Sequence, residues 1–368
     1  MEITWYEILI LILIIIYIII LFVMNYYFNK IRKSFKYVIH VNGIRGKSTT
    51  TRLIDAGFRN LGYKVFSKTT GTVPTIINVD NKDIPIKRLG PANIKEQYRM
   101  MHKAYKEGAE VLILECMAVN PELQYIVENK ILKADINVIS NVRLDHLDVM
   151  GEDLESIAHS LSNTTPTNGI LILGEDKYLD IFNKVASKNN TKCIVAKDYK
   201  VKGNLDTFIE NINTCLTLAE SINLDTKLFY EGMRDYKKDP GAYSVYKNKD
   251  TTFINGLSIN DPESILKVYN ENIKDKYDIN KLCILVNNRL DRIFRTNQMI
   301  ELVNKLQIKK IYVSGSNISY FKKKIKIDNV DIVEVNKIED ILNGEIIFGI
   351  GNIKGFGETI LEYFKGGI

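Results

Sequence analysis

The hydrophobic and polar positions follow three different patterns along the chain. Residues 8–24 are uniformly apolar, whereas residues 36–244 and 252–349 alternate short apolar runs with longer amphipathic segments. Short β-branched runs between segments of helical periodicity are typical of parallel sheets covered by helices on both faces. The pattern therefore predicts an α/β protein with an N-terminal transmembrane helix, a mostly parallel central sheet and a second, smaller α/β domain.

The apolar runs also place the strands and the domain limits. In the first α/β block we predict strands at residues 37–41, 64–67, 111–114, 136–140, 170–173 and 193–196. In the second block, after a linker around residues 239–250, we predict strands at 252–254, 282–286, 311–314, 331–335 and 346–349. The predicted domains are a membrane anchor at 1–30, a central domain at 31–245 and a C-terminal domain at 246–368.

The first apolar run has the length and the borders of a membrane span. Aromatic residues flank it on both sides, at Trp5, Tyr6, Tyr26 and Tyr27. The basic residues all follow the run, at Lys30, Arg32, Lys33 and Lys36, which by the positive-inside rule puts the rest of the chain in the cytoplasm. A cleaved signal peptide is the alternative, but no small-residue cleavage site follows the run. We predict a single-pass anchor in the cell membrane.

Composition narrows the possible partners. The net charge is only +6 over 368 residues, and acidic and basic residues are interspersed, which argues against nucleic-acid binding. The cysteines are widely spaced and form no CxxC pair, as expected of small core residues in a reducing compartment; they are Cys116, Cys193, Cys215 and Cys283.

A glycine-bearing turn follows the first predicted strand and opens a helix. Gly43 and Gly46 allow the backbone N–H groups to turn inward and cradle an anion, and the helix start adds its dipole. Lys47 can reach a terminal phosphate, and the Ser48 hydroxyl can hold Mg²⁺. Val41 replaces the first glycine of the longer nucleotide-binding motif, so the match is to GxxGK[ST]. An ordinary glycine turn is the alternative. The predicted nucleotide-binding residues are Asn42, Gly43, Ile44, Arg45, Gly46, Lys47, Ser48 and Thr49.

Polar residues follow three other predicted strands. Glu115 ends an all-apolar run, where it is either solvated or an Mg²⁺ ligand. His146 lies among acids in residues 141–148, and Lys68 to Thr72 offer hydroxyls and a flexible turn. A lone histidine is more often structural than a ligand. Because ligands of parallel sheets collect at the carboxyl ends of the strands, we expect these groups to surround one site.

This order of motifs resembles the Mur ligases and folylpoly-γ-glutamate synthetases. The resemblance rests on GIRGKSTTT, on a strand ending in Glu115 and on SNVRLDHLD. It implies a Mur-ligase-like P-loop domain and a Rossmann-like C-terminal domain, with ATP and two Mg²⁺ ions, for which Mn²⁺ can substitute. It implies that Lys47, Glu115 and His146 are catalytic. The implied metal ligands are Ser48 and Glu115 for one ion, His146 for the other, and Thr69 or Thr70 as a further ligand. Asn211 is the implied adenine contact.

Longer stretches resemble the membrane-anchored ligase subunits of poly-γ-glutamate synthases. These stretches are HVNGIRGKSTTTRL, SKTTGT, ECMAVNPE, NDPES, NNRLDRIFRTNQ and GIGNIKGFGE. The resemblance implies an ATP-dependent amide ligase that adds glutamate to growing poly-γ-glutamate through an acyl phosphate. It also implies small integral membrane subunits as partners. Another γ-glutamyl or Mur-type peptide ligase is an alternative, as is a P-loop ATPase that energises a membrane export complex.

Two departures from the Mur pattern leave the site incomplete, and a group of arginines is a further candidate. The Mur carbamylated lysine has no counterpart in residues 157–162, and Pro240-Gly241-Ala242 lacks the arginine of the Mur PGR turn. Arginines follow the strand predicted at 282–286, and their fork geometry suits substrate carboxylates. A salt-bridged surface helix is the alternative for this segment. The predicted substrate-binding residues are Arg289, Arg292 and Arg295.

Overall fold

The computed structural model describes residues 4–366 apart from 72, 89, 202–204, 206, 240, 249, 260, 291–292 and 342–343. The chain forms two compact units. Unit 1 comprises Met1–Thr70 and Pro74–Lys237, and unit 2 comprises Gly71–Val73 and Lys238–Ile368. The domain limits predicted at residues 30 and 245 stay predictions.

Unit 1 is built on an eight-stranded sheet in the order β4-β3-β2-β5-β1-β6-β7-β8. The central strand β1 pairs in parallel with β5 and β6, so the carboxyl ends of these three strands meet at one edge. β1 and β5 are apolar and almost fully buried, as expected of strands covered on both faces. The strands are β1 Tyr37–Asn42, β2 Val65–Thr69, β3 Thr75–Ile77, β4 Asp83–Pro85, β5 Val111–Glu115, β6 Ile136–Ile139, β7 Ile170–Leu173 and β8 Lys192–Val195.

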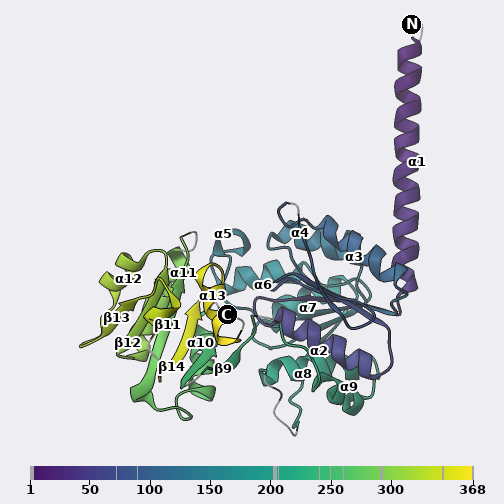
Figure 1. Cartoon of the computed structure of the whole chain (residues 1–368). Helices are drawn as coiled ribbons and strands as arrows, with labels where there is room; N and C mark the ends of the chain where they lie inside the picture. The colour runs from purple at the N-terminus through teal and green to yellow at the C-terminus, as the bar shows by residue number, and fades with distance from the viewer. Residues whose placement is uncertain are drawn as a thin grey trace. The chain divides into compact units, whose positions relative to one another are not determined.

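Helices cover both faces of this sheet (Figure 1), and two of its apolar core clusters lie on opposite faces. One core joins Leu53 and Phe58 of α2 to Leu216 of α8 and Phe229 of α9. The other packs Met101 of α3 on the opposite face. The helices of unit 1 are α1 Trp5–Ser34, α2 Lys47–Asn60, α3 Lys95–Lys106, α4 Pro121–Ile126, η1 Val127–Leu132, α5 Leu147–Met150, α6 Leu154–Ser162, α7 Leu179–Lys188, α8 Ile209–Ser221 and α9 Thr226–Met233.

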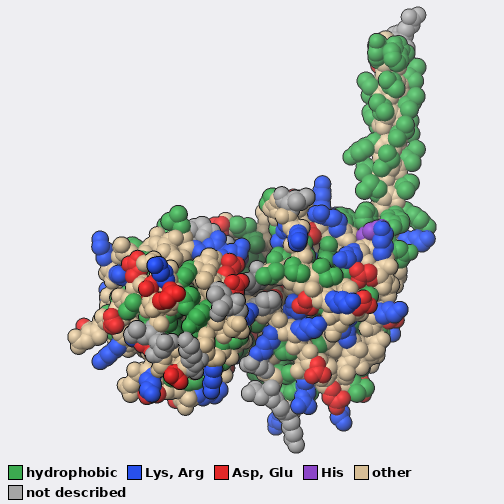
Figure 2. Space-filling model, viewed as in Figure 1, with side chains coloured by type: hydrophobic (Ala, Val, Ile, Leu, Met, Phe, Trp, Pro, Cys, Tyr) green, Lys and Arg blue, Asp and Glu red, His purple; other side chains and the backbone are tan. Residues whose placement is uncertain are grey.

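Hydrophobic side chains cover most of the face of helix α1 seen in Figure 2, and the helix could cross a membrane by its length and composition. Its last turn nevertheless belongs to unit 1, since Ile31 is 1% exposed within a core cluster. Arg32 donates to the Leu132 and Lys133 carbonyls and pairs with Asp135 at 2.7 Å. The other Asp135 oxygen accepts from the backbone N–H of Val38 in β1. Asp135 therefore links the end of α1 to the central strand of the sheet.

Unit 2 contains a six-stranded sheet in the order β13-β12-β11-β14-β10-β9. All its pairings are parallel except that of β9 with β10. Its strands are β9 Ser244–Asn248, β10 Thr251–Asn255, β11 Leu282–Asn288, β12 Lys310–Gly315, β13 Asp331–Glu334 and β14 Ile346–Gly351. Its helices are α10 Pro262–Asn272, η2 Ile279–Lys281, α11 Ile293–Leu306, α12 Ile318–Lys324, η3 Ile338–Asp340 and α13 Phe356–Phe364.

All eleven predicted strands are present, with ends shifted by at most two residues. The prediction missed β3, β4 and β9, the antiparallel strands at the sheet edges. β3 and β4 are three residues long, too short for a periodic signal, and β4 ends in a proline. β9 alternates half-buried and exposed residues and lies inside the segment interpreted as a linker. The mixed α/β fold itself is confirmed.

Candidate active site

The P-loop connects β1 to α2 and requires its two glycines. Gly43 has φ +115°, and a Cβ there would lie 2.2 Å from the Ser140 hydroxyl oxygen. Gly46 has φ +77°, and a Cβ there would lie 2.8 Å from the Asn211 side-chain oxygen. Both positions are left-handed and crowded, so a side chain would displace the loop. The loop is therefore tightly packed against the ends of β6 and α8.

Residues just after β6 hold the P-loop in shape. Asn141 accepts from Arg45 N through its side-chain oxygen at 3.0 Å and donates to the Arg45 carbonyl at 3.0 Å. The Asn141 carbonyl accepts from Ile44 N, and the Ser140 hydroxyl donates to the Arg45 carbonyl. Asn141 opens the segment 141–148 that was expected at the site, whereas Ser140 was not singled out, although it stands at a strand end.

Lys47 lies over the loop that precedes it. Its Nζ donates to the Gly43 carbonyl at 2.8 Å and to the Ile44 carbonyl at 3.3 Å. Burial lowers the Lys47 pKa, and the Glu115 carboxylate opposes that shift. The ammonium group is thus close to both the loop and Glu115, where a bound phosphate could replace its carbonyl contacts.

Glu115 ends β5 and is 2% exposed. Its Oε2 accepts from the Ser48 hydroxyl at 2.8 Å and from Thr70 N at 2.7 Å, and its Oε1 accepts from the Thr70 hydroxyl at 2.6 Å. The structure thus unites three predicted metal ligands. A carboxylate with two hydroxyls is the all-oxygen donor set that Mg²⁺ and Mn²⁺ prefer, so these residues fit such an ion.

A buried ion cluster lies behind Glu115. Gln97 donates to the Glu115 carbonyl at 3.2 Å and accepts from the Lys68 ammonium at 3.0 Å. Lys68 is fully buried and pairs with Glu96 at 2.7 Å, and Arg88 pairs with the same carboxylate at 2.9 Å. Burial acts to raise the Glu96 pKa, but the two cations outweigh it and lower that pKa to about 2. Gln97 and Glu96 carry no motif and were missed by sequence reasoning.

His146 lies at the start of α5, in a left-handed conformation with φ +53°. Its Nε2 is 3.8 Å from the Asp145 carboxylate, which pairs with Arg45 of the P-loop at 2.9 Å. Among the described residues, no group of three or more His, Cys, Asp or Glu side chains could hold a metal. The structure therefore places His146 near the P-loop through Asp145, but it does not unite it with Glu115.

The remaining nucleotide-binding predictions have different environments. Asn211, near the start of α8, lies next to Gly46, and its side-chain oxygen is 3.5 Å from the Thr50 hydroxyl. The Asn42 side chain instead donates to Gln124 and Thr164, so it helps to fix the end of β1, where the P-loop begins. Thr49 lies in the first turn of α2.

The predicted substrate arginines belong to unit 2. Arg289 follows β11, Arg295 lies in the first turn of α11, and both are partly buried with partners of their own. Arg292 is outside the described residues. Of the two departures from the Mur pattern, residues 157–162 lie in α6, and Pro240 is outside the described residues. The Ala242 carbonyl accepts from the Asn255 amide at 3.1 Å.

A P-loop at the carboxyl edge of a mostly parallel sheet, beside a carboxylate and two hydroxyls, defines a nucleotide-dependent enzyme of the Mur ligase class. Family models agree with this assignment. The Mur ligase middle domain matches residues 41–228, and the poly-gamma-glutamate synthase CapB C-terminal domain matches residues 242–367.

Two relatives resemble nearly the whole chain. "PGA synthase CapB" of Bacillus subtilis (strain 168) is 33% identical over 88% of this chain and 89% of its own length. "Capsule biosynthesis protein CapB" of Bacillus anthracis is 34% identical over 88% of this chain and 75% of its own. The chain belongs to the poly-γ-glutamate synthase CapB family, within the ATP-dependent amide ligases of Mur type. The resemblance identified from the motifs is confirmed.

Solved structures share the fold at low sequence identity. A bifunctional folylpolyglutamate synthase/dihydrofolate synthase from Yersinia pestis, with Mn, AMPPNP and L-glutamate bound, has a TM-score of 0.66 at 14% identity. That match covers 93% of this chain and 92% of the other. A folylpolyglutamate synthase from Thermotoga maritima has a TM-score of 0.61 at 16% identity, covering 91% and 90%.

Proposed function

We propose that this protein polymerises glutamate into poly-γ-glutamate by ATP-dependent amide ligation at the cytoplasmic face of the cell membrane. The observation that carries the proposal is the contact of Glu115 with Ser48 and Thr70 beside the P-loop lysine. Family membership supports the choice of polymer, since one relative is named a PGA synthase. ATP, glutamate and the growing polymer are the proposed substrates.

The proposed reaction has two steps. A γ-carboxylate oxygen of the growing chain attacks the γ-phosphorus of ATP, which forms an acyl phosphate and releases ADP. The amine nitrogen of the incoming glutamate then attacks the acyl carbon, the amide bond forms, phosphate leaves and the nitrogen gives up its proton. Both reactants of the first step are anionic, so the main contribution of the protein is electrostatic.

The residues of the P-loop supply most of that contribution. The loop N–H groups and the Lys47 ammonium bind the phosphates and hold the γ-phosphorus in place. Ser48, Thr70 and Glu115 are the proposed ligands of one Mg²⁺ ion, and His146 is the proposed ligand of a second. Mg²⁺, when bound, neutralises phosphate charge. Asn211 is the proposed adenine contact, and Arg289, Arg292 and Arg295 are proposed to bind substrate carboxylates.

The membrane assignment follows from α1. Its apolar surface and the basic residues after it support a single-pass anchor with the catalytic units in the cytoplasm. Small integral membrane subunits are the proposed partners, because the product is a polyanion that cannot cross a bilayer unaided.

The test uses membranes that carry the full-length chain. Radiolabelled glutamate is supplied with and without ATP, and the product is digested with a γ-glutamyl hydrolase. We expect ATP-dependent labelled polymer that the hydrolase degrades, and none from the Lys47→Ala protein, whose fold should be intact. ATP hydrolysis without amide formation would instead favour an ATPase that energises export. Incorporation of another amino acid would favour a different peptide ligase.

A further inference from the structure

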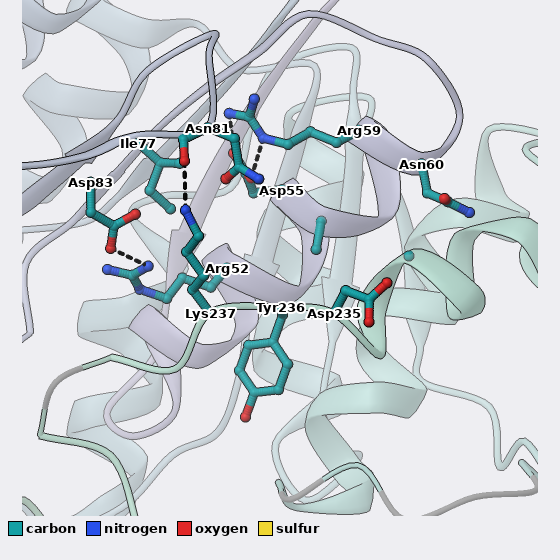
Figure 3. Close-up of a pocket in the computed structure, with 12 residues that line it drawn as sticks. Arg52, Asp55, Arg59, Asn60, Ile77, Asn81, Asp83, Asp235, Tyr236 and Lys237 are labelled. Atoms are coloured by element: carbon teal, nitrogen blue, oxygen red, sulfur yellow. Dashed lines mark hydrogen bonds and ion pairs between the residues drawn. The ribbon is translucent and has the colours of Figure 1, made fainter.

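A cavity of about 240 Å³ lies in unit 1 beside α2, on residues that the proposed reaction does not use. Arg52 and Arg59 of α2, Asp83 of β4, and Asp235 and Lys237 after α9 line it (Figure 3). The cavity is smaller than the roughly 300–1,000 Å³ of drug-sized ligand sites, so it suits one small molecule.

Close packing of two helices forms one wall of the cavity. A Cβ at Gly232 would lie 2.4 Å from Asn60 Cβ and 2.6 Å from the Ala56 carbonyl oxygen. α9 therefore approaches α2 more closely than a side chain at Gly232 would allow. The wall is fixed by backbone packing, which makes the cavity a preformed feature of unit 1.

Two arginines of α2 line the same cavity but differ in their partners. Arg59 donates to both Asp55 oxygens and to the carbonyls of Val65, Asn78 and Val79, so its guanidinium is satisfied. Arg52 is 2% exposed, yet none of its three side-chain nitrogens makes an aligned hydrogen bond. Its one ion pair, to Asp83 at 2.9 Å, lacks that alignment.

A buried guanidinium with unused N–H groups is costly, because each lost hydrogen bond to water is not replaced. A carboxylate is the group that best matches its planar fork. Arg59 is balanced by Asp55, whereas Lys237, among the described residues, donates to the neutral Asn81 carbonyl at 2.6 Å. Arg52, whose charge Asp83 already faces, thus offers unused N–H groups to a ligand, and Lys237 offers positive charge.

Negative charge lines the same space. Asp83 is about one-third exposed, and Asp235 lies at the exposed rim. A polyanion or a triphosphate would be repelled by these two carboxylates, while a ligand with both an ammonium and a carboxylate would satisfy both kinds of charge. An α-amino acid has these groups on one carbon.

We propose that the cavity between α2 and α9 is a binding site for a free amino acid zwitterion, separate from the P-loop site. Its carboxylate pairs with Arg52, and its ammonium lies against Asp83 and Asp235. Glutamate is the chosen probe, and only that choice rests on the proposed function. Because Lys237 is the last residue of unit 1, the ligand would also fix the segment through which the chain leaves that unit.

The test is calorimetric titration of the full-length protein in detergent, without nucleotide, using L-glutamate and D-glutamate in separate runs. We expect one enantiomer or both to bind one site, with the same Kd in the Lys47→Ala protein. Arg52→Met should weaken binding at least tenfold. If that variant does not fold, Lys237→Met at the exposed rim decides, with at least a threefold loss expected. Lys227→Met, an exposed charge on α9 that does not line the cavity, should change nothing.

Ligand chemistry gives the second criterion. Glutarate, which lacks the ammonium group, should bind at least tenfold more weakly than the better enantiomer. The proposal is overturned by no binding of either enantiomer, by unchanged binding after the deciding substitution, by loss of binding in Lys47→Ala, or by equal binding of glutarate. Polymer synthesis is measured separately. Binding without polymer would therefore refute the proposed function alone, and polymer without binding would refute this site alone.

Discussion

β5 of unit 1 and β11 of unit 2 are both buried parallel strands, with a buried polar side chain at the last residue of β5 and at the penultimate residue of β11. The Glu115 carboxylate accepts from the Ser48 hydroxyl in the first turn of α2 and from the hydroxyl and N–H of Thr70 after β2. The Asn287 amide donates to the Asn352 and Lys354 carbonyls, and its oxygen accepts from the Ser314 hydroxyl.

The difference between these strand ends is one of charge and of partners. A buried carboxylate held by rotatable hydroxyls keeps its charge available to a cation, because the hydroxyls can turn toward new partners. An amide that is bonded to backbone carbonyls has no spare capacity and no charge. The difference supports the proposal that Glu115 binds an ion, whereas Asn287 closes the β14–α13 loop.

The largest expected effect is that of Glu115→Gln. The neutral amide keeps the shape of the side chain and can still bond Ser48 and Thr70, but it removes the charge. We expect polymer synthesis to fall at least about 100-fold, as for loss of a key electrostatic group. The thermal midpoint should stay within a few degrees of the wild-type value. Polymer synthesis at the wild-type rate would show that the charge of Glu115 is not needed, and the two strand ends would then not differ in function.

Asn287→Leu tests the other strand end. It leaves the Asn352 and Lys354 carbonyls and the buried Ser314 hydroxyl without this partner, so we expect the unfolding free energy of unit 2 to fall by about 2–3 kcal/mol. Urea denaturation measures this loss. Asn288→Ala is the matched control, because the Asn288 side-chain nitrogen makes no hydrogen bond, and it should cost less than half as much. Equal losses would show that Asn287 has no special role.

Asn141→Ala tests whether the P-loop needs the hydrogen bonds from Asn141 to keep its shape. The change removes two side-chain hydrogen bonds to Arg45, worth about 1 kcal/mol each. We expect kcat/KM for ATP to fall about ten- to thirtyfold. The steady-state rate at varied ATP measures it, and an unchanged KM and kcat would mean that the loop keeps its shape alone.

His146→Ala asks whether a second ion is needed. We expect about tenfold more Mg²⁺ to be required for half-maximal turnover. Tenfold is the lower end of the losses in metal affinity that follow removal of a group around a metal. Mg²⁺ titration of the polymerisation rate provides the measurement. If the response to Mg²⁺ is the same as in the wild type, His146 is not a ligand.

The smallest expected effect is a pH dependence of thermal stability that arises from His40 of β1. Burial acts to lower the His40 pKa, but Cys116 and the Glu128 carboxylate, 2.8 Å away, raise it to about 9. A raised folded pKa contributes stability that is complete below about pH 6.5 and is lost as pH rises through 9. We expect the thermal midpoint to fall between pH 7 and 9.5. Glu128→Gln should flatten that slope, and an equal slope in both proteins would contradict the pairing.

The apolar pattern predicted the strands because buried parallel strands such as β5 are continuous hydrophobic runs. It could not reveal β9 or the short β3, whose residues carry no clear period. Glu115 was predictable because a carboxylate is unusual at the end of an apolar strand, and Ser48 because it belongs to the GxxGK[ST] motif. Gln97 was not, because its contact with Glu115 depends on how α3 packs on the sheet.

Helix α1 has a mechanical consequence for an enzyme at a membrane. Its 30 residues span about 45 Å, while a bilayer core needs about 30 Å, so in the proposed anchor the final turns would stand outside the lipid. The base of the helix is clamped by Ile31 and Arg32, and Tyr27 and Phe28 contact His102 and Tyr98 of α3. In the proposed anchor, this rigid connection would fix the distance between unit 1 and the bilayer, and a tilt of α1 would move unit 1 with it.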